Sequence, residues 1–322
     1  MREDVRRWFE QRTSRAADWQ PSRLMDVKGS TRVSVVLPAL NEEATVGAIV
    51  AAIRRRLVER HGLVDELVVM DSGSTDGTYD AAVQAGAKVV RREEVLSDVE
   101  PVPGKGEVLW RSLAATTGDV LVFVDSDLRD FTTSFVTGLL GPLLTQPSVQ
   151  LVKATYDRHL THGETVVPAG GGRVTELVAR PLLNLHWPQL AGFVQPLSGE
   201  YAARRGLLEQ LPFPTGYGVE IGILVDALRL VGLDGLAQVD LSRRKHRNQE
   251  IGKLGRMSSE ILQVVLSRLE REGRLSLVGA PATELVQFER SDSDYVVHTL
   301  DMAAVERPPI AGLAEYRARV TG

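Results

Sequence analysis

The sequence predicts an α/β fold with a mostly parallel, doubly wound sheet, followed by a smaller α/β portion and a C-terminal helix and tail. Three observations predict it. Short β-branched apolar runs such as VSVVLP and ELVVMD are typical of strands buried on both faces. They alternate with helical segments at a pitch that indicates right-handed βαβ units. Polar residues follow three of these runs directly, and ligands bind outside the carboxyl ends of strands in such sheets.

Four strands and three helices are expected in the first half of the chain. The predicted strands span residues 33–38, 66–71, 87–92 and 119–125. The first helix begins at Asn41 or Glu42 and runs to Arg60, the second covers 79–85, and the third runs from about 107 to 116. The carboxyl ends of three strands then carry Pro38–Glu42, Asp71–Ser74 and Asp125–Asp127. Their convergence at one sheet edge predicts a binding crevice there.

The second half is less regular. Strands are expected over 149–156 and 236–241, a helix opening at about Arg173, and a long amphipathic helix over about 255–272. The tail contains a predicted strand pair. We therefore expect four parts: an N-terminal arm (1–32), a sheet-forming half (33–155), a second half (156–272) and a C-terminal tail (273–322).

Composition narrows the class of protein. The 322 residues are 43% hydrophobic and 25% charged, as in ordinary globular proteins. A formal net charge of -4 argues against binding nucleic acid through a general basic surface. The absence of cysteine excludes disulfides, thiolate metal sites and cysteine nucleophiles. There is no apolar segment typical of a secretion signal or a membrane span, so a cytoplasmic protein is expected.

The Asp125-Ser126-Asp127 motif comes directly after the fourth predicted strand. Side chains alternate along a strand, so both aspartates can reach the same side of the crevice. Carboxylate oxygens suit Mg²⁺ or Mn²⁺ held partly by a diphosphate. The alternative is a polar turn, with Asp127 or Asp130 capping the next helix. The neighbouring polar strand ends favour the cation.

Two small-residue loops are candidate phosphate contacts. DSGSTDGT, which contains Ser72, follows the second strand but lacks the glycine and lysine spacing of a P-loop. Lys105 lies between two glycines ahead of a helix, where it can contact a diphosphate. A capped turn and an exposed lysine are the alternatives.

A different kind of anion site is predicted in the second half. Gly170, Gly171 and Gly172 precede Arg173, Val174 and Thr175 at a helix start, so free backbone N–H groups and a guanidinium surround one point. A flexible linker with a surface arginine is the alternative. His246, in the basic turn SRRKHRNQ, is a candidate metal ligand, or else part of a solvated turn. Glu220 opens an apolar helix, where the helix dipole also favours a carboxylate without any function.

Together these motifs resemble the family two nucleotide-sugar glycosyltransferases of the GT-A fold. PALNEEATVG, DSGSTDGT and VFVDSDL carry this resemblance. GGGRVTELVARPLL, QPLSGEYAARR, GYGVEIGILVDAL and AQVDLSRRKHRN are similar to the actinobacterial branch of that family, whose members transfer glucose from UDP-glucose to the 2-hydroxyl of 3-phosphoglycerate with retention. The resemblance covers residues 33–265, and it implies a metal-dependent enzyme that forms a homodimer. The half over 33–155 would bind the donor, the half over 156–272 the acceptor, and the tail is a candidate for the dimer contact.

The resemblance also implies roles for individual residues. Lys105, Asp127 and Glu220 would be catalytic, and Asp127 and His246 would bind Mg²⁺ or Mn²⁺. The residues implied for the donor are Pro38, Ala39, Leu40, Glu42, Ser72, Lys105, Asp125, Ser126, Leu197, Ser198, Gly199 and Glu220. Those implied for the acceptor are Gly172, Arg173, Val174, Thr175 and Asn248. A metal and Lys105 would stabilise the charge that develops on the leaving UDP.

Several alternatives stay open at this point. The donor could be GDP-mannose or GDP-glucose, and the acceptor free glycerate. A nucleotidyltransferase prefers basic, glycine-rich sequence after its first strand, and PALNEEATVG is acidic there. A catalytically inactive sugar-nucleotide-binding regulator is a third possibility. Glu220 could act as the nucleophile of a double displacement, or the acceptor could attack from the side that UDP leaves. The loop before Gly170 is shorter than the family pattern, and one glycine, Gly199, follows Ser198 where two are as common.

Overall fold

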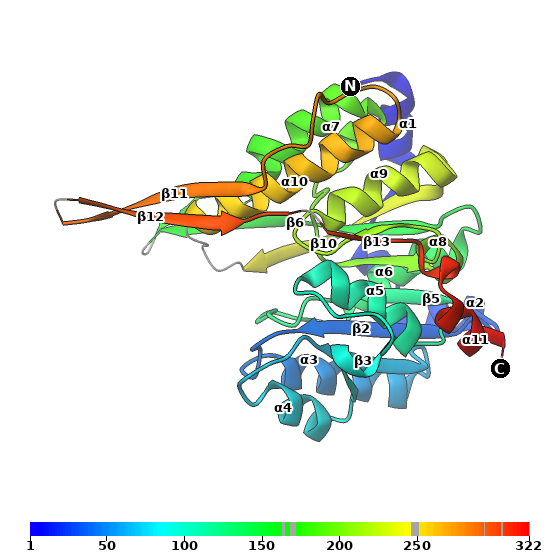
Figure 1. The fold of residues 1–322 in the computed structure, drawn as a ribbon. Coiled ribbons are helices and arrows are strands. Elements are labelled where there is room, and N and C mark those ends of the chain that lie inside the picture. The colour runs from blue at the N-terminus through cyan, green and yellow to red at the C-terminus, as the bar shows by residue number, and fades with distance from the viewer. Residues whose placement is uncertain (163–164, 168–171, 246–250, 293, 304, 322) are drawn as a thin grey trace.

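One large sheet forms the centre of the molecule. The computed structural model describes residues 1–162, 165–167, 172–245, 251–292, 294–303 and 305–321. In this part of the chain the sheet has the order β1-β10-β6-β8-β5-β2-β3-β4, with β7 beside β6. Its neighbours are parallel except β7 and β8, and β8 runs antiparallel to both β5 and β6. Helices lie on both faces, so the predicted mostly parallel, doubly wound α/β fold is confirmed (Figure 1).

The strands follow the apolar runs of the sequence. Those of the large sheet are β1 (Thr13–Arg15), β2 (Val33–Ala39), β3 (Glu66–Asp71), β4 (Lys88–Arg91), β5 (Val120–Phe123), β6 (Leu151–His162), β7 (Thr165–Val167), β8 (Tyr201–Arg204) and β10 (Leu236–Lys245). Two further two-stranded sheets lie outside it. One pairs β11 (Glu284–Ser291) with β12 (Asp294–Asp301), and the other pairs β9 (Phe213–Pro214) with β13 (Glu306–Arg307).

The helices connect these strands. The α-helices are α1 (Glu3–Arg12), α2 (Pro21–Lys28), α3 (Val46–Ile53), α4 (Thr78–Ala85), α5 (Lys105–Ala115), α6 (Ser134–Thr145), α7 (Arg180–His186), α8 (Arg205–Leu208), α9 (Val219–Val231), α10 (Ile251–Arg271) and α11 (Ala314–Thr321). Short 3-10 or π segments are η1 (Ala16–Asp18), η2 (Arg54–Arg60), η3 (Arg92–Glu94), η4 (Thr175–Ala179), η5 (Pro188–Gly192), η6 (Leu233–Gly235) and η7 (Ile310–Gly312).

The sheet separates two hydrophobic cores. Val35 and Leu37 of β2 pack into the core on the side of α3 and α6, whereas Val36 packs into the core on the side of α5 and α9. This alternation follows from the period of two along a strand. Because β2, β3 and β5 bury apolar residues on both faces, their sequences are almost continuously apolar rather than alternating, as predicted.

The predicted start of the first helix was wrong. α3 begins at Val46 rather than at Asn41 or Glu42. Asn41 instead has a positive φ of 57°, and its side-chain oxygen accepts a hydrogen bond from the Thr75 backbone N–H at 2.8 Å. The loop after β2 is therefore tied to the loop after β3 before the helix starts.

The N-terminal segment belongs to the fold. Trp8 of α1 is 2% exposed and donates from its indole nitrogen to the Leu236 carbonyl at 2.8 Å. β1 then pairs in parallel with β10 at the edge of the sheet. Because α1 carries several arginines and glutamates, its sequence pattern predicted only a polar arm.

The C-terminal tail forms a projecting hairpin and returns to the sheet domain. β11 and β12 form an antiparallel hairpin, so the predicted strand pair is confirmed. The hairpin extends away from the rest of the chain (Figure 1). The chain then runs back through residues 305–309, which we call the strap, where β13 pairs with β9. The predicted long helix is α10, with Ile261, Val264 and Leu269 in the core. No helix in the described ranges combines the length and apolarity that crossing a bilayer requires.

Candidate active site

A pocket of about 640 Å³ opens at the carboxyl ends of β2, β3 and β5. It brings together residues that are far apart in the sequence. Its lining includes eight residues predicted to bind the donor, Pro38, Ala39, Leu40, Glu42, Ser72, Lys105, Asp125 and Ser126, and the predicted metal ligand Asp127. They meet because the parallel strands β5, β2 and β3 end at one edge of the sheet.

Hydrogen bonds between the loops hold this edge together. The Ser126 hydroxyl donates to the Pro38 carbonyl at 2.8 Å, and the Thr45 hydroxyl donates to the Ser126 carbonyl at 2.6 Å. Ser126 is 2% exposed, so its side chain contributes to the pocket mainly by fixing the loops after β5 and β2. Asp127, the next residue, is exposed at the pocket wall.

Lys105 is the centre of an ion-paired group. It is the first residue of α5, and its ammonium lies 2.6 Å from Asp125 Oδ1 and 3.0 Å from Glu220 Oε1. Glu220 comes from the first turn of α9. Gly199 completes the group, because a Cβ at this position would lie 2.4 Å from Asp125 Oδ2 and 2.5 Å from Lys105 Nζ. The structure thus brings together four of the predicted residues.

The surroundings of Lys105 keep its ammonium charged. Burial alone would lower its pKa, but the carboxylates of Asp125 and Glu220 hold that pKa well above the ordinary value. Burial lowers the pKa of nearby Lys153 to about 8, although Glu220 opposes this shift. Burial and Glu220 raise the pKa of Tyr201 well above its ordinary value, so its hydroxyl stays neutral at pH 7.

Lys153 supports the turn that contains Gly199. It is 1% exposed and donates from Nζ to the Ser198 carbonyl at 2.5 Å. The Ser198 hydroxyl bonds within the turn, donating to the Glu200 carbonyl at 3.1 Å. Leu197 packs against the core on the α9 side. Ser198 and Leu197 therefore shape the turn, while Gly199 lies directly against Lys105.

Acidic side chains outnumber basic ones around the pocket. Lys105 and Arg256 are the basic residues among its described lining, and the acidic residues are Glu42, Asp125, Asp127, Glu260 and Asp301. A diphosphate carries negative charge and would be repelled by this lining in the absence of a cation. The carboxylates of Asp125 and Glu220 and the ammonium of Lys105 instead suit sugar hydroxyls, which both donate and accept hydrogen bonds.

The oxygen atoms available at the pocket suit a divalent cation that is bound partly by the diphosphate. Asp125 is ion-paired with Lys105, and the exposed carboxylate of Asp127 lies at the pocket wall, where it would meet a metal that enters with a diphosphate. In the described ranges no three histidine, cysteine or acidic side chains gather as a metal site. One carboxylate and diphosphate oxygens supply the hard oxygen ligands that Mg²⁺ and Mn²⁺ prefer. His246, the other predicted ligand, lies outside the described residues.

The predicted acceptor residues lie apart from this lining. Gly172 has a positive φ of 77° just before the helical turn that begins with Arg173 and Val174. Thr175 is buried, and its hydroxyl has no hydrogen-bond partner in the described part of the chain. Arg173 and Val174 line a second cavity of about 760 Å³, between η4, α10 and the hairpin. α10 borders both cavities: Arg256 and Glu260 line the first, and Gly252, Leu254, Gly255 and Ser258 line the second. Asn248 and the glycines at 170 and 171 lie outside the described residues.

Several lining residues had no signal in the sequence. Glu260 of α10 is 9% exposed and accepts a hydrogen bond from the Tyr217 backbone N–H at 2.5 Å. Met302 and Val305 reach the pocket from the C-terminal tail. The amphipathic pattern of α10 identifies its buried face but not a pocket wall, and nothing local marks the tail.

Comparison with known proteins gives a consistent result. Residues 34–157 match the family described as glycosyl transferase family 2. Glucosyl-3-phosphoglycerate synthase of Mycolicibacterium smegmatis is 50% identical over 95% of this chain and 98% of that relative. The protein of the same name from Petrotoga mobilis is 44% identical over 91% of this chain and 90% of that relative.

Solved structures extend the comparison. Mycobacterium tuberculosis glucosyl-3-phosphoglycerate synthase, in complex with Mn²⁺, UDP and glucosyl-3-phosphoglycerate, superposes with a TM-score of 0.80 at 48% identity, covering 91% of this chain and 95% of that one. The same protein has been solved with Mn²⁺, UDP-glucose and phosphoglyceric acid. Mannosyl-3-phosphoglycerate synthase from Rubrobacter xylanophilus gives a TM-score of 0.87 at 41% identity, covering 95% of this chain and 97% of that one.

Proposed function

The chain belongs to the glucosyl-3-phosphoglycerate synthase family, and from this premise we propose that it transfers glucose from UDP-glucose to the 2-hydroxyl of 3-phosphoglycerate. The products are glucosyl-3-phosphoglycerate and UDP. The observation that carries the proposal is the pocket in which the ends of three strands meet the Lys105, Asp125 and Glu220 group. Relatives solved with Mn²⁺ or Mg²⁺ and UDP support a metal-dependent glycosyltransferase.

We assign the donor to the pocket at the strand ends. Pro38, Ala39, Leu40, Glu42 and Ser72 border the part where uridine would lie. Asp127, with His246, would hold the metal against the diphosphate, where the metal supplies positive charge to the leaving UDP. Glu220, Asp125 and Gly199 surround the Lys105 ammonium and would contact the glucose. Lys105 then lies between sugar and diphosphate, where its charge opposes the negative charge that develops as the glycosidic bond breaks.

The acceptor assignment rests on the glycine-rich helix start. Gly172, Arg173, Val174 and Thr175, together with Asn248, would bind the phosphate and carboxylate of 3-phosphoglycerate. A helix start offers free N–H groups and partial positive charge, and arginine adds a bidentate fork. The division into a donor half (33–155), an acceptor half (156–272), an N-terminal part (1–32) and a tail (273–322) is proposed on the same basis. Retention at the anomeric carbon and a cytoplasmic location stay predictions.

The test is release of UDP from UDP-glucose in the presence of Mg²⁺ or Mn²⁺. We expect release to require both the metal and 3-phosphoglycerate, with glycerate a poor substitute because it lacks the phosphate that the Arg173 region would bind. NMR of the product reports the position of attachment and the anomeric configuration. Binding of UDP-glucose without turnover on any acceptor would instead indicate a regulator, and inversion of the anomeric centre would contradict the proposed stereochemistry.

A second candidate is transfer of mannose from GDP-mannose to the same acceptor. The higher TM-score of the Rubrobacter xylanophilus mannosyl-3-phosphoglycerate synthase favours it. The curated relatives at 44% to 50% identity over most of the chain, which are glucosyl-3-phosphoglycerate synthases, favour UDP-glucose. The same assay with UDP-glucose, GDP-glucose and GDP-mannose in parallel separates the candidates by kcat/KM.

We further propose that the protein forms a homodimer through the β11–β12 hairpin. The hairpin exposes Phe288 at 67%, Val297 at 56% and Tyr295 at 59%, and it extends away from its own core (Figure 1). An isolated two-stranded hairpin with exposed apolar side chains is marginal in water, so a covering surface would stabilise it. Light scattering is expected to give twice the mass of one chain, and Phe288→Glu to shift the mass toward one chain. A single-chain mass for the unsubstituted protein at micromolar concentration would refute the proposal.

A further inference from the structure

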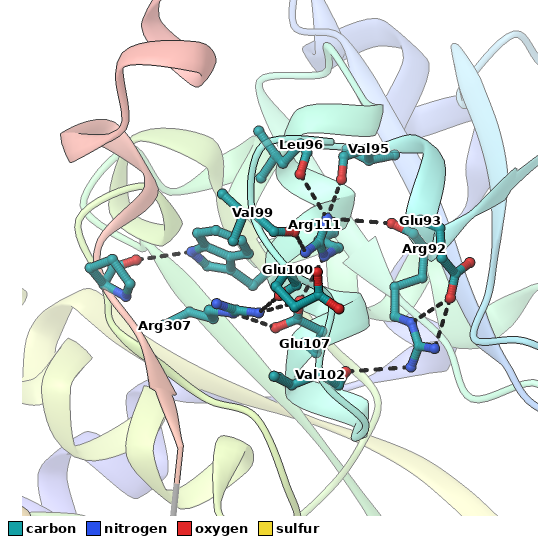
Figure 2. Close-up of polar contacts among 12 residues, drawn as sticks. Arg92, Glu93, Val95, Leu96, Val99, Glu100, Val102, Glu107, Arg111 and Arg307 are labelled. Carbon is teal, nitrogen blue, oxygen red and sulfur yellow. Dashed lines mark hydrogen bonds and ion pairs between the residues drawn. The ribbon is translucent and has the colours of Figure 1, made fainter.

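Arg307 of the strap reaches the first turn of α5. Its Nε lies 2.6 Å from Glu107 Oε2, and its Nη2 lies 2.9 Å from Glu107 Oε1 (Figure 2). Nη2 also donates to the Glu100 carbonyl at 2.5 Å. The guanidinium stacks over the Trp110 ring, 5.4 Å from its centroid, and the Trp110 indole donates to the Pro308 carbonyl at 2.9 Å. One strap residue therefore holds both the loop before α5 and the start of α5 itself.

A second arginine fixes the same loop from within. Glu107 and Arg111 are fully buried, with Arg111 Nε 2.6 Å from Glu107 Oε1. Arg111 also donates to the carbonyls of Val95, Leu96 and Val99, and Figure 2 shows these contacts converging on its guanidinium. The buried carboxylate of Glu107, between Arg111 and Arg307, thus joins α5 to the strap and to the loop over residues 95–100.

The backbone of the strap supports Lys105 from the other side. The Val305 carbonyl accepts a hydrogen bond from the Thr215 N–H at 2.9 Å, beside the β13–β9 pair. The Thr215 carbonyl in turn accepts from the Gly106 N–H at 2.8 Å. At Gly104, which has φ +124°, a Cβ would lie 2.1 Å from the Thr215 carbonyl oxygen. The two glycines that flank Lys105 are therefore packed directly against the segment that the strap holds.

We propose that Arg307 is a positioning residue for Lys105, acting through Glu107 to hold the start of α5 so that the Lys105 ammonium stays between Asp125 and Glu220. Lys105 and Glu107 are two residues apart in one helical turn, so displacement of Glu107 shifts Lys105 with it. Removing one partner of a buried ion pair can also destabilise the fold, so the affinity is measured on variants shown to be folded. The inference rests on the proposed function, because it takes Lys105 to contact the donor.

The experiment is a double-mutant cycle on the affinity for UDP-glucose in the presence of Mn²⁺, measured by calorimetry on the full chain. The proteins are the unsubstituted chain, Arg307→Met, Lys105→Met and the double variant. Arg307→Met is expected to weaken binding about tenfold alone and less than twofold in the Lys105→Met background, since interacting residues are not additive. Three results would overturn the positioning role. Arg307→Met could weaken the affinity for UDP-glucose equally in both backgrounds, it could have no effect, or binding could disappear only in the double variant.

Two further variants keep the outcome interpretable. Arg271→Met removes an exposed arginine that pairs with Glu306 on the same strap. In the described part of the chain Arg271 has no hydrogen bond or ion pair to the loop before α5, and its replacement is expected to leave the affinity unchanged. Arg307→Lys keeps the charge but loses the two-pronged contact, and it is expected to bind with intermediate affinity; it replaces Arg307→Met in the cycle if the methionine variant does not fold. If the unsubstituted protein does not bind UDP-glucose, the proposed function fails. If it binds and the cycle is additive, only the positioning role fails.

Discussion

Replacing Asp127 with asparagine is expected to lower kcat about a thousandfold, equal to about 4 kcal/mol in the activation free energy. It is also expected to raise the concentration of Mn²⁺ needed for half-maximal activity. The carboxylate lies at the pocket wall among four other acidic side chains, and a diphosphate enters such a lining only with a cation. An amide has the same shape as the carboxylate but no charge, so the cation is held more weakly.

The matched control for this prediction is Asp130→Asn. Asp130 is exposed and lies three residues further along, outside the pocket lining. Both variants remove one negative charge from the same loop, so a general charge effect would act on both. Titration of activity with Mn²⁺, together with calorimetry of UDP binding with and without Mn²⁺, checks the prediction. If Asp127→Asn keeps the metal requirement of the unsubstituted protein unchanged, Asp127 is not a ligand and the metal assignment is wrong.

Lys105→Met is expected to lower kcat by about a hundredfold to a thousandfold, the range found when one group that stabilises transition-state charge is removed. The substitution also leaves Asp125 and Glu220 close together without the ammonium that now separates them. Repulsion between the two carboxylates is then no longer opposed by a positive charge.

Lys88→Met serves as the control for the loss of a lysine. Lys88 is exposed on β4 and donates to the Ala115 carbonyl, away from the pocket. Steady-state kinetics with UDP-glucose as the varied substrate compares the two variants. Thermal unfolding followed by circular dichroism separates a change in the folded fraction from a change in the site. A Lys105→Met variant that retains kcat within a few-fold of the unsubstituted protein would remove Lys105 from the proposed mechanism.

The donor side of the pocket could be predicted from local sequence. Each strand is a continuous apolar run, and parallel strands end at one edge, so Pro38, Ser72 and Asp125 had to meet once the sheet formed. The glycine-rich start at Arg173 was equally visible, because a helix start is a local feature. The position of this helix start beside the second cavity could not be predicted, because it depends on how η4 packs against α10.

Only the tertiary structure decided the partners of the charged side chains. The motif Asp125-Ser126-Asp127 does not reveal that one aspartate pairs with Lys105 while the other lies at the pocket wall. Arg307 and Glu107 are 200 residues apart, and an arginine before two prolines has no local pattern that distinguishes a buried ion pair from an exposed one. Apolar periodicity determines which residues are buried, whereas the choice of a partner for a charge depends on which segments the completed fold brings within a few ångströms.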